Sequence, residues 1–271
     1  MFKYEFMRRA FLVGFFLSII IPLIGTVVVN RKTSTIGDAL SHTTLSGIFL
    51  GVLLGINPIL GGIAISIFSA FSIEFLREKF PKNGDMATAI IMSFGIGLAS
   101  ILSDYIIAAQ NFESYLFGSI VAITDMDIIM VIAISIIVII AFIYTYHALL
   151  FISVDKTSAR LSGVNIKFIN YIFTLLLAIT IAISSRIVGI LIISSLMVLP
   201  VASSILIGKN YKQTVIISVI FGIVYFFLGL TFANYLKLKP GGSIIMTSVI
   251  GLLLVMLYIY IFRKEKMTSF K

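Results

Sequence analysis

Apolar runs of about twenty residues recur along the chain from Ala10 to Phe262. A helix rises 1.5 Å per residue, so such a run is long enough to cross a hydrocarbon core of roughly 30 Å. Only 11% of the residues are charged, whereas soluble domains carry roughly 25%. The sequence therefore predicts an all-α polytopic membrane protein, organised as a single transmembrane domain over residues 1–271.

We predict nine membrane-spanning helices. The first is too long for a secretory signal peptide and lacks a small-residue cleavage site. A tenth apolar stretch, in NFESYLFGSIVAITDMD between the fourth and fifth spans, is too short to cross and predicts a short outer helix or a re-entrant segment. The predicted spans are Ala10–Val29, Leu40–Ile56, Pro58–Leu76, Met86–Ala109, Ile128–Ser153, Ile166–Ser184, Ile187–Ile207, Thr214–Tyr235 and Ile244–Phe262.

Basic residues set the predicted orientation, because loops on the cytoplasmic side carry an excess of Lys and Arg. With a cytoplasmic C-terminal tail at 263–271, fourteen of the twenty basic residues lie on the cytoplasmic side. The nine spans then put the N-terminus outside, so that MFKYEFMRRAF is expected to lie along the interface as a short amphipathic helix. The basic residues left on the outer side are Lys3, Arg8, Arg9, Arg186, Lys237 and Lys239.

The net charge of +9 does not indicate nucleic-acid binding, since the basic residues lie between and beyond the apolar runs. In these places they act as topology signals and contact lipid headgroups. The absence of cysteine excludes disulfides and thiolate metal ligands, which leaves nitrogen and oxygen donors. The chain also has no G-x-x-x-x-G-K-[ST] phosphate loop. We therefore expect no enzymatic activity from it, and any ATP hydrolysis belongs to another subunit.

An aspartate and a histidine stand at the start of the second apolar run, in GDALSH. Asp38 and His42 are four residues apart, so they share one face of a helix. A carboxylate and a neutral imidazole suit zinc and also serve manganese. Ionisable residues at membrane depth indicate function. The alternative is that Asp38 caps the helix and His42 bonds a neighbouring carbonyl. We predict that the pair is a metal ligand set.

Three glycines follow the pair at four-residue spacing: Gly47, Gly51 and Gly55. A stripe of small residues lets another helix approach closely, and this stripe lies roughly opposite Asp38 and His42. The glycine face is therefore predicted to pack in protein, leaving the carboxylate and imidazole to line a pathway. Two donors make a poor metal site, and a twofold dimer with this helix near its axis would supply four.

A polar loop on the cytoplasmic side, ISVDKTSARLSGVNIKF, predicts a short helix at about 155–164. Asp155 suits its start and Gly163 its end. A compact helix between two spans is typical of a docking element for a soluble partner, and we expect Asp155, Ala159 and Gly163 to carry that coupling. The alternative is a connecting loop with no partner.

Two further stretches bear on the pathway. In SSRIVGILIISSLMVLPVASS, Pro200 falls inside an apolar run and is predicted to kink the helix. The serines of this run add polar surface for close packing or for a wet lumen. Glu74, Arg77 and Glu78 are interpreted as a solvated inner rim. His147 is taken as structural.

In four blocks the chain resembles the membrane subunits of bacterial ABC importers for zinc and manganese. The blocks are the stretch from MRRAFLVGF through GDALSHTTLSGIFLGVLLGINP, then ESYLFGSI, SVDKTSARLSGVN and RIVGILIISSLMVLPVASS. The resemblance implies a fold like that of vitamin B12-type (type II) importer permeases, located in the bacterial cell membrane.

The resemblance also implies how the assembly works. Two permeases pair with two cytoplasmic ABC ATPase subunits, and an extracytoplasmic metal-binding lipoprotein delivers the ion. Asp38 and His42 match the residues thought to contact the metal, and 155–164 matches the coupling region. No cofactor is bound permanently; the cargo is Zn²⁺ or Mn²⁺, with zinc favoured, and ATP binds the partner subunit. The alternative function is an ATP-independent secondary transporter or channel for a divalent cation.

Overall fold

The computed structural model describes residues 5–80, 83–106, 118 and 123–262. Nine helices in this part of the chain are long and apolar enough to cross a membrane, which confirms the predicted number of spans. They are α1 (Glu5–Asn30), α2 (Ile36–Leu53), α3 (Pro58–Lys79), α4 (Gly84–Ser103), α6 (Asp125–Val154), α8 (Ile166–Val188), α9 (Ile190–Ile207), α10 (Tyr211–Leu236) and α11 (Pro240–Phe262). A short helix, α7 (Lys156–Leu161), lies between α6 and α8.

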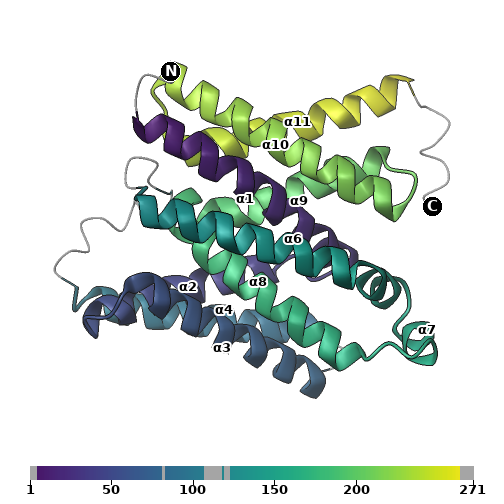
Figure 1. The fold of residues 1–271 in the computed structure, drawn as a ribbon, viewed down its shortest axis with the longest axis horizontal. Coiled ribbons are helices and arrows are strands. Elements are labelled where there is room, and N and C mark those ends of the chain that lie inside the picture. The colour runs from purple at the N-terminus through teal and green to yellow at the C-terminus, as the bar shows by residue number, and fades with distance from the viewer. Residues whose placement is uncertain (1–4, 81–82, 107–117, 119–122, 263–271) are drawn as a thin grey trace.

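The helices form two outer groups on either side of a central set (Figure 1). One outer group is α2, α3 and α4, which pack on one another; the other is α10 and α11. Between them lie α1, α6, α8 and α9, with α1 contacting α6, α9 and α10. The segments at 107–117 and 119–122, which contain most of the predicted outer or re-entrant piece, lie outside the described residues, as does the tail at 263–271.

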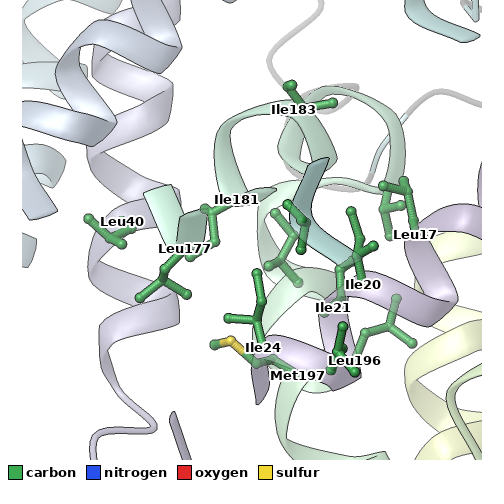
Figure 2. Packing of buried hydrophobic residues seen from close by; sticks show 14 of the residues in the cluster. Leu17, Ile20, Ile21, Ile24, Leu40, Leu177, Ile181, Ile183, Leu196 and Met197 are labelled. Carbon is green, nitrogen blue, oxygen red and sulfur yellow. The ribbon is translucent and has the colours of Figure 1, made fainter. Parts of the chain in front are cut away.

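The core lies where α1, α8 and α9 meet (Figure 2). Leu17, Ile20, Ile21 and Ile24 follow one another along α1 at helical spacing and are almost fully buried. They share one hydrophobic cluster with residues of the other two helices, among them Leu177, Ile181, Leu196 and Met197. Because lipid is as apolar as these side chains, close packing rather than escape from water stabilises this contact.

The N-terminal segment differs from the prediction. The described part of the expected interfacial helix, from Glu5 onward, is the first part of α1 and not a separate element. Arg9 in this segment has partners within the protein. The Arg9 guanidinium pairs with the Glu5 carboxylate at 2.6 Å and with that of Asp125 at 3.0 Å, and it donates to the Ile123 carbonyl oxygen at 3.1 Å. These partners neutralise a basic residue on the side that the positive-inside rule disfavours.

Several span boundaries also moved, and two of these shifts affect the candidate site or its surroundings. The second span was predicted to begin at Leu40, but α2 begins at Ile36, so Asp38 and His42 lie inside the helix. The sixth and seventh spans were predicted to be separated near Arg186. Instead α8 runs to Val188, and Gly189 alone separates it from α9. Gly189 has φ of 98°, a backbone conformation that glycine adopts without a Cβ clash.

Candidate functional site

Asp38 lies in the first turn of α2, where a carboxylate interacts favourably with the helix dipole. Its side chain is half-buried and accepts a hydrogen bond from the hydroxyl of Ser194 on α9. The neighbouring Gly37 packs against α9 as well, since a Cβ there would lie 2.2 Å from Cε at the end of the flexible Met197 side chain. The carboxylate therefore faces α9 within the protein.

His42 follows one turn later on α2 and is also half-buried. Its imidazole and the Asp38 carboxylate supply one nitrogen donor and one oxygen donor. In the part of the chain that the structure describes, no group of three or more His, Asp or Glu side chains is placed to hold a metal ion. One copy of this chain therefore offers a pair of donors there, half of the tetrahedral set that zinc prefers.

The opposite contacts of α2 are made by glycine. A Cβ on Gly47 would lie 2.5 Å from the Gly61 carbonyl oxygen of α3, and one on Gly51 would lie 3.0 Å from Cα of Pro58. The two backbones touch, with no room for side chains between them. Gly55 does not belong to this face, contrary to the prediction. It follows the end of α2, has φ of 68°, and has nothing within 4 Å of its Cβ position.

Hydroxyl side chains share the buried part of α2 with apolar ones. Thr43, Thr44 and Ser46 are fully buried, and each donates to a carbonyl oxygen three or four residues earlier in the same helix. Such bonds satisfy the hydroxyl without requiring a partner from another helix. Asp38 is different because its partner comes from α9, 156 residues away in the sequence.

The helix α7 occupies the predicted position between the fifth and sixth spans. Asp155 caps it by accepting hydrogen bonds from the amides of Thr157 at 2.9 Å and Ser158 at 3.1 Å. Together with the Ser158 hydroxyl, these bonds hold the pKa of Asp155 below its ordinary value. Ala159 is 1% exposed, and Gly163 ends the segment with φ of 80°. The helix thus presents a polar cap and buries one small side chain.

The serine-rich stretch covers the end of α8 and most of α9, in which Pro200 is buried within an unbroken helix. Ser194 is the member of this stretch that reaches Asp38. Further along, the Ser203 hydroxyl lies 2.9 Å from the hydroxyl of Tyr225 on α10, while Ser204 bonds its own helix backbone. The kink at Pro200 stays a prediction.

A polar network joins the turn between α1 and α2 to α3 and α8, and no sequence pattern predicted it. Arg31, in the turn between α1 and α2, donates to the Asn170 amide oxygen of α8 at 3.0 Å, and the Asn170 amide nitrogen donates to Glu74 of α3 at 3.1 Å. Glu74 and Arg77 are half-buried, so only Glu78 fits the predicted solvated rim. No local spacing connects residues 31, 74 and 170. A lone Asn in an apolar run was the one available signal.

The other polar candidates lie elsewhere. His147, near the inner end of α6, is exposed and meets the Tyr146 ring edge-on at 5.3 Å. Asp104 caps the end of α4 and is exposed. In the described part of the chain, no hydrogen bond or ion pair joins either residue to Asp38 or His42, so the chemistry of the site comes from α2 and α9.

Relatives of known sequence cover almost the whole chain. A "Probable metal transport system membrane protein" of Treponema pallidum is 36% identical over 94% of this chain and 96% of its own length. The zinc uptake membrane protein ZnuB of Haemophilus influenzae is 31% identical over 90% and 94%. The manganese transport membrane protein MntC of Listeria monocytogenes is 28% identical over 92% and 89%.

A solved structure shares the fold. PsaBC from Streptococcus pneumoniae, in complex with Fab, superposes with a TM-score of 0.84 at 25% identity, covering 93% of this chain and 91% of that one. The protein described here is thus a multi-pass protein of the bacterial cell membrane with the fold of an ABC importer permease. The model of the ABC 3 transport family matches residues 3–259, and the chain belongs to that family.

Proposed function

We propose that this chain is the membrane subunit of an importer that moves a divalent transition-metal ion into the cell, with zinc favoured and manganese next. One observation carries the proposal. Asp38 and His42 are half-buried on one face of α2, and Asp38 faces α9 rather than lipid. A carboxylate and an imidazole at this depth are costly to bury unless they serve a cation.

The donor set favours zinc. Zinc takes nitrogen and oxygen donors in a tetrahedral arrangement, whereas manganese prefers more oxygens. Relatives whose names specify zinc and others whose names specify manganese are similarly distant from this chain, so the choice rests on the chemistry of the pair. A second copy of the chain with its α2 near the twofold axis would complete four donors. An incomplete site in each copy suits a carrier, which has to release its ion.

Energy is supplied by ATP hydrolysis on cytoplasmic ABC ATPase subunits, and α7 is the docking element for them. Its cap at Asp155, its buried Ala159 and the turn at Gly163 give the short helix a defined shape. An extracytoplasmic metal-binding lipoprotein delivers the ion to the outer ends of the spans. The permease itself performs no catalysis.

The test uses the permease with its ATPase and lipoprotein in liposomes. We expect ATP-dependent uptake of Zn²⁺, competed less well by Mn²⁺, and no uptake by the double variant Asp38→Ala, His42→Ala. The same variant should lose Zn²⁺ binding while assembling normally. Unchanged uptake by that variant would remove the ligand assignment. Uptake that continues in the permease alone, without ATP, would favour a secondary transporter or channel.

A further inference from the structure

Three polar side chains meet on the inner side although they come from separate elements. Arg31 lies in the turn between α1 and α2, Glu74 in the last part of α3, and Asn170 in the second turn of α8. The amide of Asn170 accepts from Arg31 and donates to Glu74. Its orientation follows from chemistry, because a guanidinium only donates and a carboxylate only accepts.

The amide therefore stands between opposite charges. In the described structure no ion pair joins Arg31 directly to Glu74, although such a pair would be stronger than a bond to a neutral amide. Arg31 also lies over the Phe173 ring, with its guanidinium carbon 5.0 Å from the ring centroid. Asn170 and Phe173 lie on the same side of α8, so two residues of this helix contact the guanidinium.

Arg31 is not fully satisfied in this arrangement. Its Nε and Nη2 atoms are buried without a hydrogen-bond partner. Burial lowers the pKa of Arg31 to about 10, and the Glu74 carboxylate opposes that shift. The residue stays charged at neutral pH. A buried charge with unused donors, next to a carboxylate that it does not reach, has a second arrangement available: direct pairing once the amide is withdrawn.

The positions of the three residues connect two functional elements. Asn170 follows the end of α7 by nine residues, so a movement of α7 shifts the start of α8. Arg31 precedes Asp38 by seven residues. The turn between them is held by its own backbone bonds, from the Thr33 amide to Val28 and from the Ile36 amide to Thr33. We therefore expect a displacement of Arg31 to reach the first turn of α2.

We propose that Arg31, Asn170 and Glu74 form a latch with two states, one bridged by the Asn170 amide and one with Arg31 paired directly to Glu74. Movement of α7 exchanges the two states and so shifts Asp38. This inference rests on the proposed function, in which α7 receives the ATPase and Asp38 receives the ion. Asn170 is a positioning residue, which touches neither.

The first experiment measures ions imported per ATP hydrolysed by the complete importer in liposomes, with Zn²⁺ as the probe. Asn170→Leu removes both hydrogen bonds at similar size. Lys167→Gln is the matched control, because Lys167 is exposed one turn earlier on the same helix. We expect Asn170→Leu to keep Zn²⁺ binding and ATP hydrolysis while import per ATP falls about tenfold. A ratio equal to that of Lys167→Gln would overturn the latch.

A second variant, Asn170→Asp, tests the latch if Asn170→Leu assembles poorly. Asn170→Asp keeps an acceptor for Arg31 but removes the donor to Glu74, so the bridged state cannot form as it is. It should lower import per ATP as well. In a Glu74→Gln background, where no direct ion pair can form, Asn170→Leu should cause no further loss. Additive losses in that double variant would contradict the two-state exchange.

Amide hydrogen exchange separates failure of the latch from failure of the proposed function, since it needs no metal. ATP with vanadate should change exchange in the Asn30–Thr35 turn of the unsubstituted assembly and of Lys167→Gln, but not of Asn170→Leu. An unchanged response in Asn170→Leu would overturn the latch. If the exchange pattern is as expected while neither Zn²⁺ nor Mn²⁺ is transported, the latch stands and the proposed cargo is wrong.

Discussion

Two membrane-spanning helices of this protein, α2 and α11, are used in opposite ways. Of an 18-residue apolar stretch in each helix, 72% is buried inside the protein in α2 and 11% in α11. Yet α2 is the least apolar of the nine spans. In a water-soluble protein the more apolar of two helices would be the more buried one. In a bilayer the solvent is hydrocarbon, so exposed apolar surface carries no penalty, and the hydroxyls, glycines and charges of α2 favour its position inside the protein.

Among substitutions that test this difference between α2 and α11, Asp38→Asn is expected to have the largest effect, which is on metal uptake. The substitution keeps the shape of the side chain and its bond to Ser194 while removing the charge, so uptake should be abolished with the assembly intact. Transport assays measure metal uptake, and size-exclusion profiles measure the integrity of the assembly. Asp104→Asn is the matched control, because Asp104 is exposed at the end of α4. Normal uptake by Asp38→Asn would mean that α2 is buried for packing alone.

Gly47→Leu should be next in size. A Cβ at this position would already lie 2.5 Å from the Gly61 carbonyl oxygen, so α2 and α3 have to separate. Overpacking of this kind typically costs about 1–3 kcal/mol or more, and we expect reduced yield and a lower thermal midpoint in detergent. Gly97→Leu, on the open side of α4 with nothing within 4 Å, should be tolerated. Equal yields for the two would contradict the close contact.

Truncating leucines tests burial directly. Leu40 of α2 is 0% exposed and Leu253 of α11 is 57% exposed. Leu40→Ala should lower the free energy of unfolding by about 2–4 kcal/mol through lost packing, whereas Leu253→Ala should change it by less than about 0.5 kcal/mol. Reversible unfolding in mixed micelles compares the two. A large loss for Leu253→Ala would show that another chain covers α11.

The smallest effect concerns α7, which lies outside the spans. The folded-state pKa of Asp155 is depressed, mainly by the Ser158 hydroxyl and then by the Thr157 and Ser158 amides. Its cap therefore stabilises α7 above the ordinary pKa of 3.8, and the effect is lost as pH falls through the depressed value. Asp155→Ala should raise amide exchange in α7 at neutral pH without changing exchange in α2. Similar rises in both would mean that the cap stabilises the whole protein rather than α7 locally.

Much of the fold was accessible from the sequence because apolar length is a strong signal in a membrane protein. Nine spans, the short helix after Asp155 and the proximity of Asp38 to His42 all follow from local spacing. Boundaries were less secure. The start of α2 was placed four residues late because Asp38 was treated as the edge of an apolar run. Hydropathy alone cannot indicate that a polar residue inside a helix forms a hydrogen bond with another helix.

What the sequence could not supply was the set of contacts between distant residues. The Ser194 hydroxyl and the Asp38 carboxylate are 156 residues apart, and the bonds of Asn170 reach 139 residues back to Arg31 and 96 to Glu74. Each residue is unremarkable alone. The prediction for Gly55 was wrong for a local reason. Its spacing matched the glycine stripe, but α2 ends before it, and helical spacing does not apply beyond the end of a helix.

The junction at Gly189 has a consequence for biogenesis. A single residue joins α8 to α9, and its neighbours Val188 and Ile190 are 5% and 2% exposed. Nothing between these two helices is long enough to be threaded through the translocon as an independent segment. We therefore expect the two helices to insert together, so that Ser194 and Asn170 enter the bilayer in the same step.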